Sequence, residues 1–438
     1  MLNKWLFTRV DNSSLIVFRI IFGALIALEA FGAIFTGWID RNLIEPEFTF
    51  NFIGFDFLQP LPGNGMIWYY AVMGVLGVLV MVGFKYRWSM LLYALLWTGV
   101  YLMQKTSYNN HYYLLMLLCY LMVLLPAHKF ASLDVKRNPG TRQYSMPQWC
   151  WILLVGQIWL VYLFGAIAKL YPDWMDASVP ALLMRSKADY WLIGGLLQQE
   201  WAHYVIAWFG ILFDFLIIPL LLFRRTRTLG FIAAIFFHLF NSVVFQIGIF
   251  PYLALAFVLF FFPSQQINRI FLKSKPHYDK NEVIVPLKSG LIKTFLIGWF
   301  LVQIALPLRH LFFTDRVLWT EEGHRMSWRM MLRARSGVAV YTVVDKESGQ
   351  KIKIDKEDYL TPKQARSAAS KPDIIWQFAQ HLKTEFAKEG KDVAVYVDAR
   401  ISINGRPYKP FIDPSVDLAG EKWHHFSHHH WILPSKLD

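Results

Sequence analysis

One lysine stands at the end of a long apolar stretch, in a place where its amine could act as a base. The stretch runs from Gln148 to Trp174 and reads QWCWILLVGQIWLVYLFGAIAKLYPDW, with Lys169 where the apolar run stops. Asp173 and Trp174 follow shortly after it. A lysine in water is protonated at neutral pH and is a poor base, whereas burial disfavours the charged form. Lys169 is therefore either an anchor at a membrane interface or a functional amine, and the residues alone favour the anchor.

Three further stretches place polar side chains beside apolar runs. The first, YNNHYY at residues 108–113, is either a helix start with an asparagine cap or a set of donors and acceptors at a cavity mouth. In FFHLFNSVVFQIGIFPY, His238 and Asn241 are three residues apart and share a helix face, which favours a functional role inside a membrane. The third, His324–Ser336, suits either the floor of a domain packed on a helix bundle or a basic connector.

A histidine-rich run near the end of the chain, Trp423–Pro434 (WHHFSHHHWILP), invites a metal interpretation. A structural zinc site needs defined spacing and usually cysteine or carboxylate partners. Both cysteines, Cys119 and Cys150, lie elsewhere, in or beside apolar runs, and imply no disulfide framework. We therefore expect no metal site and assign the run a structural or interface role. Motifs of common soluble enzymes, such as G-x-S-x-G and HExxH, are absent from the sequence.

The elements that must position these residues are membrane helices. The chain is 55% hydrophobic and 17% aromatic, and 17% of its residues are charged, against about a quarter in soluble domains. Several apolar runs approach the roughly 20 residues that span a bilayer. We expect a polytopic α-helical membrane protein with about nine transmembrane helices, at residues 13–39, 65–84, 88–104, 110–126, 148–170, 203–223, 229–247, 249–263 and 291–308.

The first apolar run is too long for a signal peptide and carries two charges, Arg19 and Glu29. They are ten positions apart, too far along the axis to pair directly, so we expect each to pair with a neighbouring helix. Residues 177–200 are amphipathic and are expected to lie in the interface or to dip back into the protein.

Lysine and arginine are unevenly distributed among the loops, which predicts the orientation. With a cytoplasmic N-terminus, the outer loops hold, besides Lys169, only Arg41, Lys105, Arg185 and Lys187. The inner loops hold Lys85, Arg87, Lys129, Lys136, Arg137, Arg142, Arg224, Arg225, Arg227, Arg269, Lys273, Lys275, Lys280 and Lys288. The net charge of +13 then reflects topology and not nucleic-acid binding, and Lys169 lies at the outer, periplasmic or lumenal, end of its helix.

Composition divides the chain into a transmembrane domain, residues 1–308, and an extracytoplasmic domain, residues 309–438. We expect the second to be a small α+β or β-rich module. Its predicted elements are a hairpin around ESGQ, a helix over Pro372–Lys388 stopped by Gly390, and a strand over Val393–Ile403 with Asn404-Gly405 as the turn into 407–412.

Six stretches together resemble the vitamin K-dependent γ-glutamyl carboxylase family, including its bacterial relatives. The membrane part of these relatives is called the horizontally transferred transmembrane (HTTM) domain. In chain order the stretches are FRIIFGALIALE, NNHYYL, GAIAKLYPDW, FFHLFNSVVFQIGIFPY, SWRMMLRARS and WHHFSHHHWILP. One such motif would be weak, but six in order over nearly the whole chain are specific.

The resemblance implies an enzyme that oxidises reduced vitamin K (menaquinol or phylloquinol) with O2 to the epoxide. The strong base formed on the way removes a γ-proton from a glutamate of a protein or peptide partner, and the carbanion takes up CO2. Lys169 would be the weak base that deprotonates the hydroquinone, with His111 assisting; Ala168 stands where the family often has a second lysine. The residues implied to hold the quinol are Asn110, His238, Asn241, Phe250, Met330 and Met331.

The chain departs from animal members of the family in two ways. Animal members have a longer outer region that grips the propeptide, and a disulfide for which this chain lacks the cysteines. Both features favour a bacterial inner membrane over the endoplasmic reticulum. Two alternatives stay open: a quinol epoxidase that carboxylates no protein, and a non-enzymatic transporter or lipid-binding membrane protein. The sequence predicts no oligomeric state.

Overall fold

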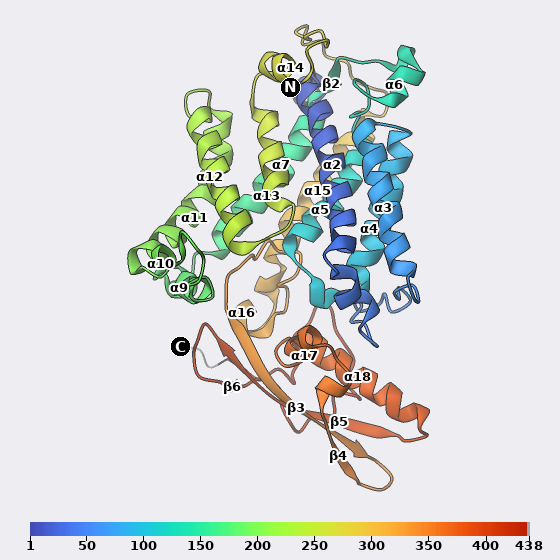
Figure 1. Ribbon diagram of the computed structural model, residues 1–438, viewed down its shortest axis with the longest axis vertical. Coiled ribbons are helices and arrows are strands. Elements are labelled where there is room, and N and C mark those ends of the chain that lie inside the picture. The colour runs from blue at the N-terminus through green and yellow to red at the C-terminus, as the bar shows by residue number, and fades with distance from the viewer. Residues whose placement is uncertain (436–438) are drawn as a thin grey trace.

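The computed structural model describes residues 1–435 and consists of a helix bundle with a mixed α/β domain at one end (Figure 1). Within that part of the chain, six helices are long and apolar enough to cross a membrane. They are α2 (Ser13–Phe35), α3 (Gly65–Val82), α7 (Gln148–Ala168), α11 (Glu200–Leu222), α12 (Arg227–Phe245), and α15 (Ser289–Leu308) with the turn that extends it.

The expected count of nine transmembrane helices is not confirmed. Three more helices run along the bundle: α4 (Tyr86–Met103), α5 (Asn110–Leu124) and α13 (Phe250–Phe257). α4 is less apolar than the six, and α5 has 15 residues, which span only about 22 Å. α13 has 8 residues and ends in a 3-10 turn. The apolar runs predicted these three elements, but each is short or polar for a helix that faces lipid along its whole length.

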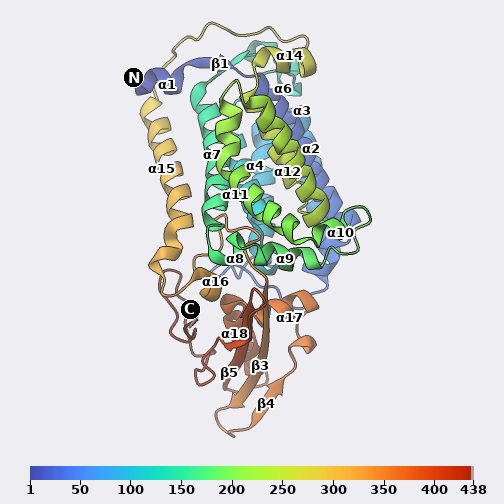
Figure 2. The ribbon, with the colours of Figure 1, turned by 90° about the vertical axis from the view of Figure 1, so that its left-hand side faces the viewer.

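The basic loops gather at the end of the bundle opposite the mixed domain (Figures 1 and 2). Among them are the short helices α6 (Leu133–Arg137) and α14 (Ser264–Phe271). The short helices α8 (Pro172–Met175), α9 (Ser178–Arg185) and α10 (Gly194–Leu197) lie at the other end, beside the mixed domain. This separation is the one that the lysine and arginine distribution predicts.

Glycines allow α2 and α3 to approach each other closely. A Cβ on Gly23 would lie 2.3 Å from the backbone nitrogen of Met81, and one on Gly77 would lie 2.7 Å from that of Ala27. Such distances cannot be accommodated without a backbone shift. Small residues at helix contacts are the usual means of close packing in membranes, where helix association depends on van der Waals contact.

Of the two charged residues of α2, Glu29 meets the hydroxyl of Tyr112 on the neighbouring helix α5, whereas Arg19 is satisfied by a loop. Arg19 is buried and donates to the carbonyl oxygens of Ala127, Phe130 and Ala131, in the loop that follows α5. Because three carbonyls can satisfy a guanidinium, no acidic partner is needed there. Glu29 forms no ion pair with any residue of the described chain, 1–435.

The mixed domain contains a four-stranded antiparallel sheet in the order β4-β3-β5-β6. The predicted hairpin, helix and long strand are confirmed, and the last strand is shorter than expected. Asn404 and Gly405 both have positive φ, as the predicted tight turn requires. The strands are β3 (Arg335–Asp345), β4 (Lys351–Ile354), β5 (Val393–Ile403) and β6 (Lys409–Pro410), and α17 (Pro362–Ala368) and α18 (Pro372–Lys388) contact the sheet.

Candidate active site

Lys169 lies at the end of α7, beside the mixed domain. The helix ends here because Tyr171 is extended before Pro172, which begins α8. The Lys169 side chain is turned into the protein, and the residue is 8% exposed. Its amine forms an ion pair with Asp214 of α11, which is also buried, and lies 5.7 Å from the centre of the Trp174 ring. Lys169 is therefore not extended into water as an interfacial anchor would be.

The Lys169–Asp214 pair lines an apolar cavity of about 350 Å³ between α7, α11, α12 and α13. The cavity brings together six of the eight residues that the sequence proposed: Lys169, His111, Asn241, Phe250, Met330 and Met331. They come from five separate stretches of the chain. The His111 and Phe250 rings are in contact, with centroids 4.1 Å apart.

His238 does not line this cavity, contrary to our expectation. It is 1% exposed and lies behind the wall, where its Nε2 is 2.9 Å from the hydroxyl of Tyr162. Its ring packs against Phe250, with centroids 6.0 Å apart. His238 and Asn241 both lie on α12, but of the two only Asn241 lines the cavity. His238 therefore supports two lining residues and does not reach the cavity itself.

Asn110 does not line this cavity, but it does line a second cavity that adjoins it. Its side-chain amide donates to the carbonyl oxygen of Arg329 at 3.1 Å and its carbonyl accepts from the hydroxyl of Tyr108 at 2.9 Å. Asn109, the residue before it, caps α5 by accepting from the backbone of Tyr112. Asn110 thus ties the start of α5 to the mixed domain, while His111 in the same turn faces the Lys169 cavity.

Two residues of the site were missed at the sequence level, Asp214 and Tyr162. A signal for Asp214 was present, because it is a carboxylate inside the apolar run of α11 and such groups are costly unless they face a partner or a cavity. Tyr162 stands about two turns before Lys169 on α7 and had no distinguishing signal in the sequence. Both line the cavity.

A second cavity, of about 550 Å³, adjoins the first and shares His111, Met330 and Met331 with it. Its wall between α5 and the mixed domain is strongly cationic. Burial lowers the pKa of Lys371 to about 8 and that of Arg329 to about 10. The charged residues that line it are Arg325, Arg329, Arg333 and Lys371, against one carboxylate, Glu321.

Glu321 is held ionised by its neighbours. Burial by itself would raise the pKa of this carboxyl, but the charges of Arg333 and Arg335 outweigh burial, and the pKa falls to about 2. Glu321 forms an ion pair with Arg333. Arg329 has no such partner: its buried Nε lacks a hydrogen-bond acceptor among the described residues. The residues that line the second cavity therefore carry more positive than negative charge.

The histidine-rich run packs the mixed domain. His428 and His429 contact the two carboxylate oxygens of Glu322 at 2.7 and 3.0 Å. His429 is buried and stacks on the ring of Trp423, with centroids 4.1 Å apart. No group of three or more histidine, cysteine, aspartate or glutamate side chains that could hold a metal ion occurs among residues 1–435. These contacts are structural ones.

Comparison with protein families matches both parts of the chain. The model of the HTTM domain matches residues 7–265, more than half of the chain. The model of the vitamin K-dependent gamma-carboxylase lumenal domain matches residues 288–438, which include the mixed domain. No solved structure matches the chain. The two matches follow one another along the chain, and the chain belongs to the vitamin K-dependent gamma-carboxylase family.

Proposed function

We propose that this protein is a vitamin K hydroquinone-dependent γ-glutamyl carboxylase, which couples epoxidation of the quinol by O2 to deprotonation and CO2 addition at a protein glutamate. The observation that carries the proposal is the buried Lys169–Asp214 pair in the wall of an apolar cavity that adjoins a cationic one. Membership of the carboxylase family supports the same activity.

The apolar cavity fits a quinol with a long hydrocarbon tail. Aromatic and aliphatic side chains form most of its wall, and Lys169, Asp214, His111, Asn241 and Tyr162 are among the few residues with polar groups there. Three lining residues, Trp201, Val205 and Phe236, are more than half exposed on the outside of the bundle. The cavity therefore reaches a surface that faces lipid, where a membrane quinol resides. When bound, reduced vitamin K supplies the reaction with O2 that generates the strong base.

Lys169 and Asp214 are suited to take up a proton at a buried place. An ammonium–carboxylate pair in an apolar wall carries a large desolvation cost. If the shared proton moves to the carboxyl group, both the amine and the carboxylic acid are neutral. In that form Asp214 holds the proton and the Lys169 amine is free to accept one from an acidic hydroxyl group in the cavity. His111 adds a ring nitrogen at the same cavity, and its contact with Phe250 fixes the plane of the ring.

The cationic cavity suits a glutamate side chain that arrives from the mixed domain. Guanidinium and ammonium groups bind carboxylates through charge-assisted hydrogen bonds, and Arg329 and Lys371 line the cavity. Because the two cavities share His111, Met330 and Met331, a carboxylate held there would lie beside the site of base formation.

One assay separates the candidate functions. The purified full chain is incubated with vitamin K hydroquinone, O2, labelled bicarbonate and a glutamate-rich peptide. Epoxide together with label in the peptide supports the carboxylase, and epoxide alone supports an epoxidase without protein carboxylation. The absence of both products would point to a non-enzymatic transporter or lipid-binding protein. We expect both products from the wild type.

The same assay tests the role of Lys169. Lys169→Ala should abolish epoxide formation while the protein still elutes as a folded species. Lys187→Ala is the matched control, because Lys187 lies at the same end of the bundle and lines neither cavity; it should keep the wild-type rate. Wild-type epoxidation by Lys169→Ala would exclude Lys169 as the base.

We further propose that the basic loops face the cytoplasm and that the mixed domain faces the periplasm or lumen. A single cysteine at Thr226, between α11 and α12, should resist an impermeant thiol reagent added outside intact cells. A cysteine at Ser348, in the β3–β4 turn, should react. The native Cys119 and Cys150 are buried and should not interfere. Labelling at Thr226 would reverse the orientation.

A further inference from the structure

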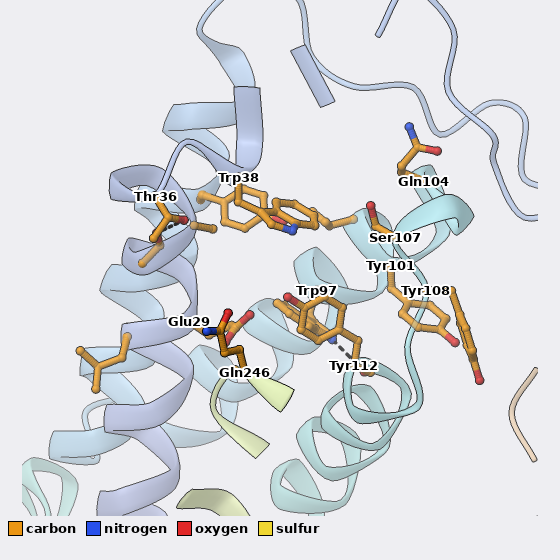
Figure 3. A pocket seen from close by; sticks show the side chains of 16 residues that line it. Glu29, Thr36, Trp38, Trp97, Tyr101, Gln104, Ser107, Tyr108, Tyr112 and Gln246 are labelled. Carbon is orange, nitrogen blue, oxygen red and sulfur yellow. Dashed lines mark hydrogen bonds between the residues drawn. The ribbon is translucent and has the colours of Figure 1, made fainter. Parts of the chain in front are cut away.

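A third cavity, of about 380 Å³, lies among the ends of α2, α3, α4 and α5 that are nearest the mixed domain (Figure 3). Neither Lys169 nor His111 lines it. Glu29 projects from α2 toward aromatic side chains on the other helices (Figure 3). The aromatic residues of the wall are Trp38, Tyr70, Trp97, Tyr101, Tyr108 and Tyr112.

Glu29 differs from three buried carboxylates at this end of the molecule because it has no cationic partner. Asp214 pairs with a lysine, Asp173 with an arginine, and Asp373 with both a lysine and an arginine. Among residues 1–435 no lysine, arginine or histidine forms an ion pair with Glu29, and only the hydroxyl of Tyr112 interacts with its carboxylate. A carboxylate inside a membrane span is costly without a partner of opposite charge. The cavity therefore contains a carboxylate whose charge a bound cation could balance.

The walls indicate what kind of cation would supply that charge. Aromatic faces attract organic cations, and a cage of tryptophan and tyrosine rings is the usual receptor for an ammonium group. Calcium or magnesium would need several oxygen ligands, whereas here one carboxylate stands among rings. The complementary ligand is therefore an ammonium ion that carries carbon.

The cavity is open on the side of α2. Leu28, the residue before Glu29, is 64% exposed. Thr36, Gln246 and Gly248, which also line the cavity, are exposed as well. Glu29 lies six residues before the end of α2, or about 9 Å along the axis. The α12–α13 turn passes over the carboxylate: a Cβ on Gly248, whose φ is +63°, would lie 3.7 Å from a Glu29 oxygen. A ligand can reach Glu29 from the outer part of the membrane, near the lipid headgroups.

We propose that this cavity binds an organic ammonium group, with Glu29 as its counter-ion and the surrounding rings, Trp38 and Tyr112 among them, as its cage. The ammonium group is either the headgroup of an aminophospholipid or a free amine from outside. The proposal concerns a site separate from Lys169 and holds whether or not the protein carboxylates glutamate.

Thermal unfolding of the full chain in nanodiscs tests the proposal. Discs of phosphatidylglycerol are compared with discs that also contain phosphatidylethanolamine or phosphatidylcholine, and with phosphatidylglycerol discs to which ethanolamine or choline is added. We expect an ammonium compound to raise the melting temperature by about 3 °C or more. A rise with lipids alone identifies a headgroup, and a rise with free amines as well identifies a soluble ligand. No rise in any arm would overturn the proposal.

Variants locate the effect. Glu29→Gln should abolish the rise, while Glu45→Gln, which removes the same charge from an exposed position after α2, should keep it. An equal rise in Glu29→Gln would contradict the site. If that variant fails to fold, a photoreactive alkylammonium probe applied to the wild type decides the matter. The probe should label peptides that contain Trp38 or Tyr112, and labelling confined to other peptides would exclude the cavity.

Discussion

Asp214 determines the chemical setting of Lys169. A lysine at the end of an apolar helix would ordinarily extend its amine to water, but the carboxylate of a neighbouring helix holds this amine inside the protein. Both groups line the same cavity, so the amine is accessible to a bound molecule while bulk water is largely excluded. A proton can pass between the two partners without leaving a net charge in the apolar wall.

Replacing Asp214 with asparagine tests this arrangement. The amide keeps the shape of the side chain but cannot hold the proton that the amine must lose. We expect Asp214→Asn to lower the rate of quinol epoxidation by about 100-fold or more, and Asp214→Glu to restore part of it. Asp189→Asn, on an exposed loop, is the control and should be neutral. Epoxide formation would be measured by chromatography, and wild-type activity in Asp214→Asn would exclude a role for the pair.

The pH dependence of stability should reveal Glu321. Its pKa is about 2 in the folded protein against an ordinary value of 4.5, because arginine charges outweigh the effect of burial. Between these values the unfolded chain binds a proton and the folded one does not, so stability should fall as the pH falls from 4.5 toward 2. Melting temperatures of wild type and Glu321→Gln across this range provide the measurement.

The acid-induced loss of stability should be smaller in Glu321→Gln, and part of it should remain. The remainder is expected because neighbouring charges also hold the pKa of Asp373 below its ordinary value, despite burial. Glu347→Gln is a suitable control, since Glu347 lies in the exposed β3–β4 turn. An unchanged slope in Glu321→Gln would show that its ion pair with Arg333 contributes nothing to stability.

At the scale of elements, the start of α5 has two tasks. Asn109 caps the helix, Asn110 binds the mixed domain, and His111 faces the Lys169 cavity. Asn109 precedes the helix in an extended conformation, and Asn110 and His111 point in different directions because successive positions on a helix are about 100° apart. The stretch YNNHYY is therefore a joint between the two domains as well as part of the site.

The contact between α2 and α3 offers a test of packing. A methyl group at Gly23 would collide with the backbone of α3, whereas one at Gly298 on α15 would meet open space. Gly23→Ala should therefore lower the melting temperature in detergent by several degrees, and Gly298→Ala should leave it unchanged or raise it slightly. Equal melting temperatures for the two variants would show that α2 and α3 can separate without cost.

For the whole molecule, ion pairs join the two domains. Lys105, after α4, contacts Asp373 at the start of α18 at 2.6 Å, and Arg325 of the mixed domain contacts the same carboxylate at 2.6 Å. Asp173 of α8 likewise contacts Arg406 after β5, with a second oxygen–nitrogen distance of 2.8 Å. Lys105 and Asp373 are almost completely buried. The floor of the cationic cavity is thereby held against the bundle.

Removing the shared carboxylate should loosen this attachment. Asp373→Asn leaves the Lys105 ammonium buried without its counter-charge, which costs on the order of 3–5 kcal/mol. We expect faster proteolytic release of the mixed domain in the variant. Asp392→Asn breaks an exposed ion pair with Lys346 and should behave as the wild type. Equal release from both variants would show that other contacts hold the domain.

The sequence by itself determined the features that depend on local patterns. Apolar runs located the helices, and the charges of the loops predicted which helix ends lie on the same side of the bundle. The period-2 and period-3.6 patterns predicted the hairpin, the helix over residues 372–388 and the strand over 393–403. Six stretches in order also predicted the family, which the two family matches confirm. These properties reside in neighbouring residues, so no knowledge of the packing was required.

Only the tertiary structure decided which polar groups meet. Asp214 is 45 residues from Lys169, and no local rule indicates that α7 and α11 are neighbours. Packing also placed His238 behind the cavity wall, turned Asn110 toward the mixed domain and left Glu29 facing a cage of rings without a cation. The reason is physical: a charge or an amide inside a membrane takes its role from its partner, and helix packing selects that partner.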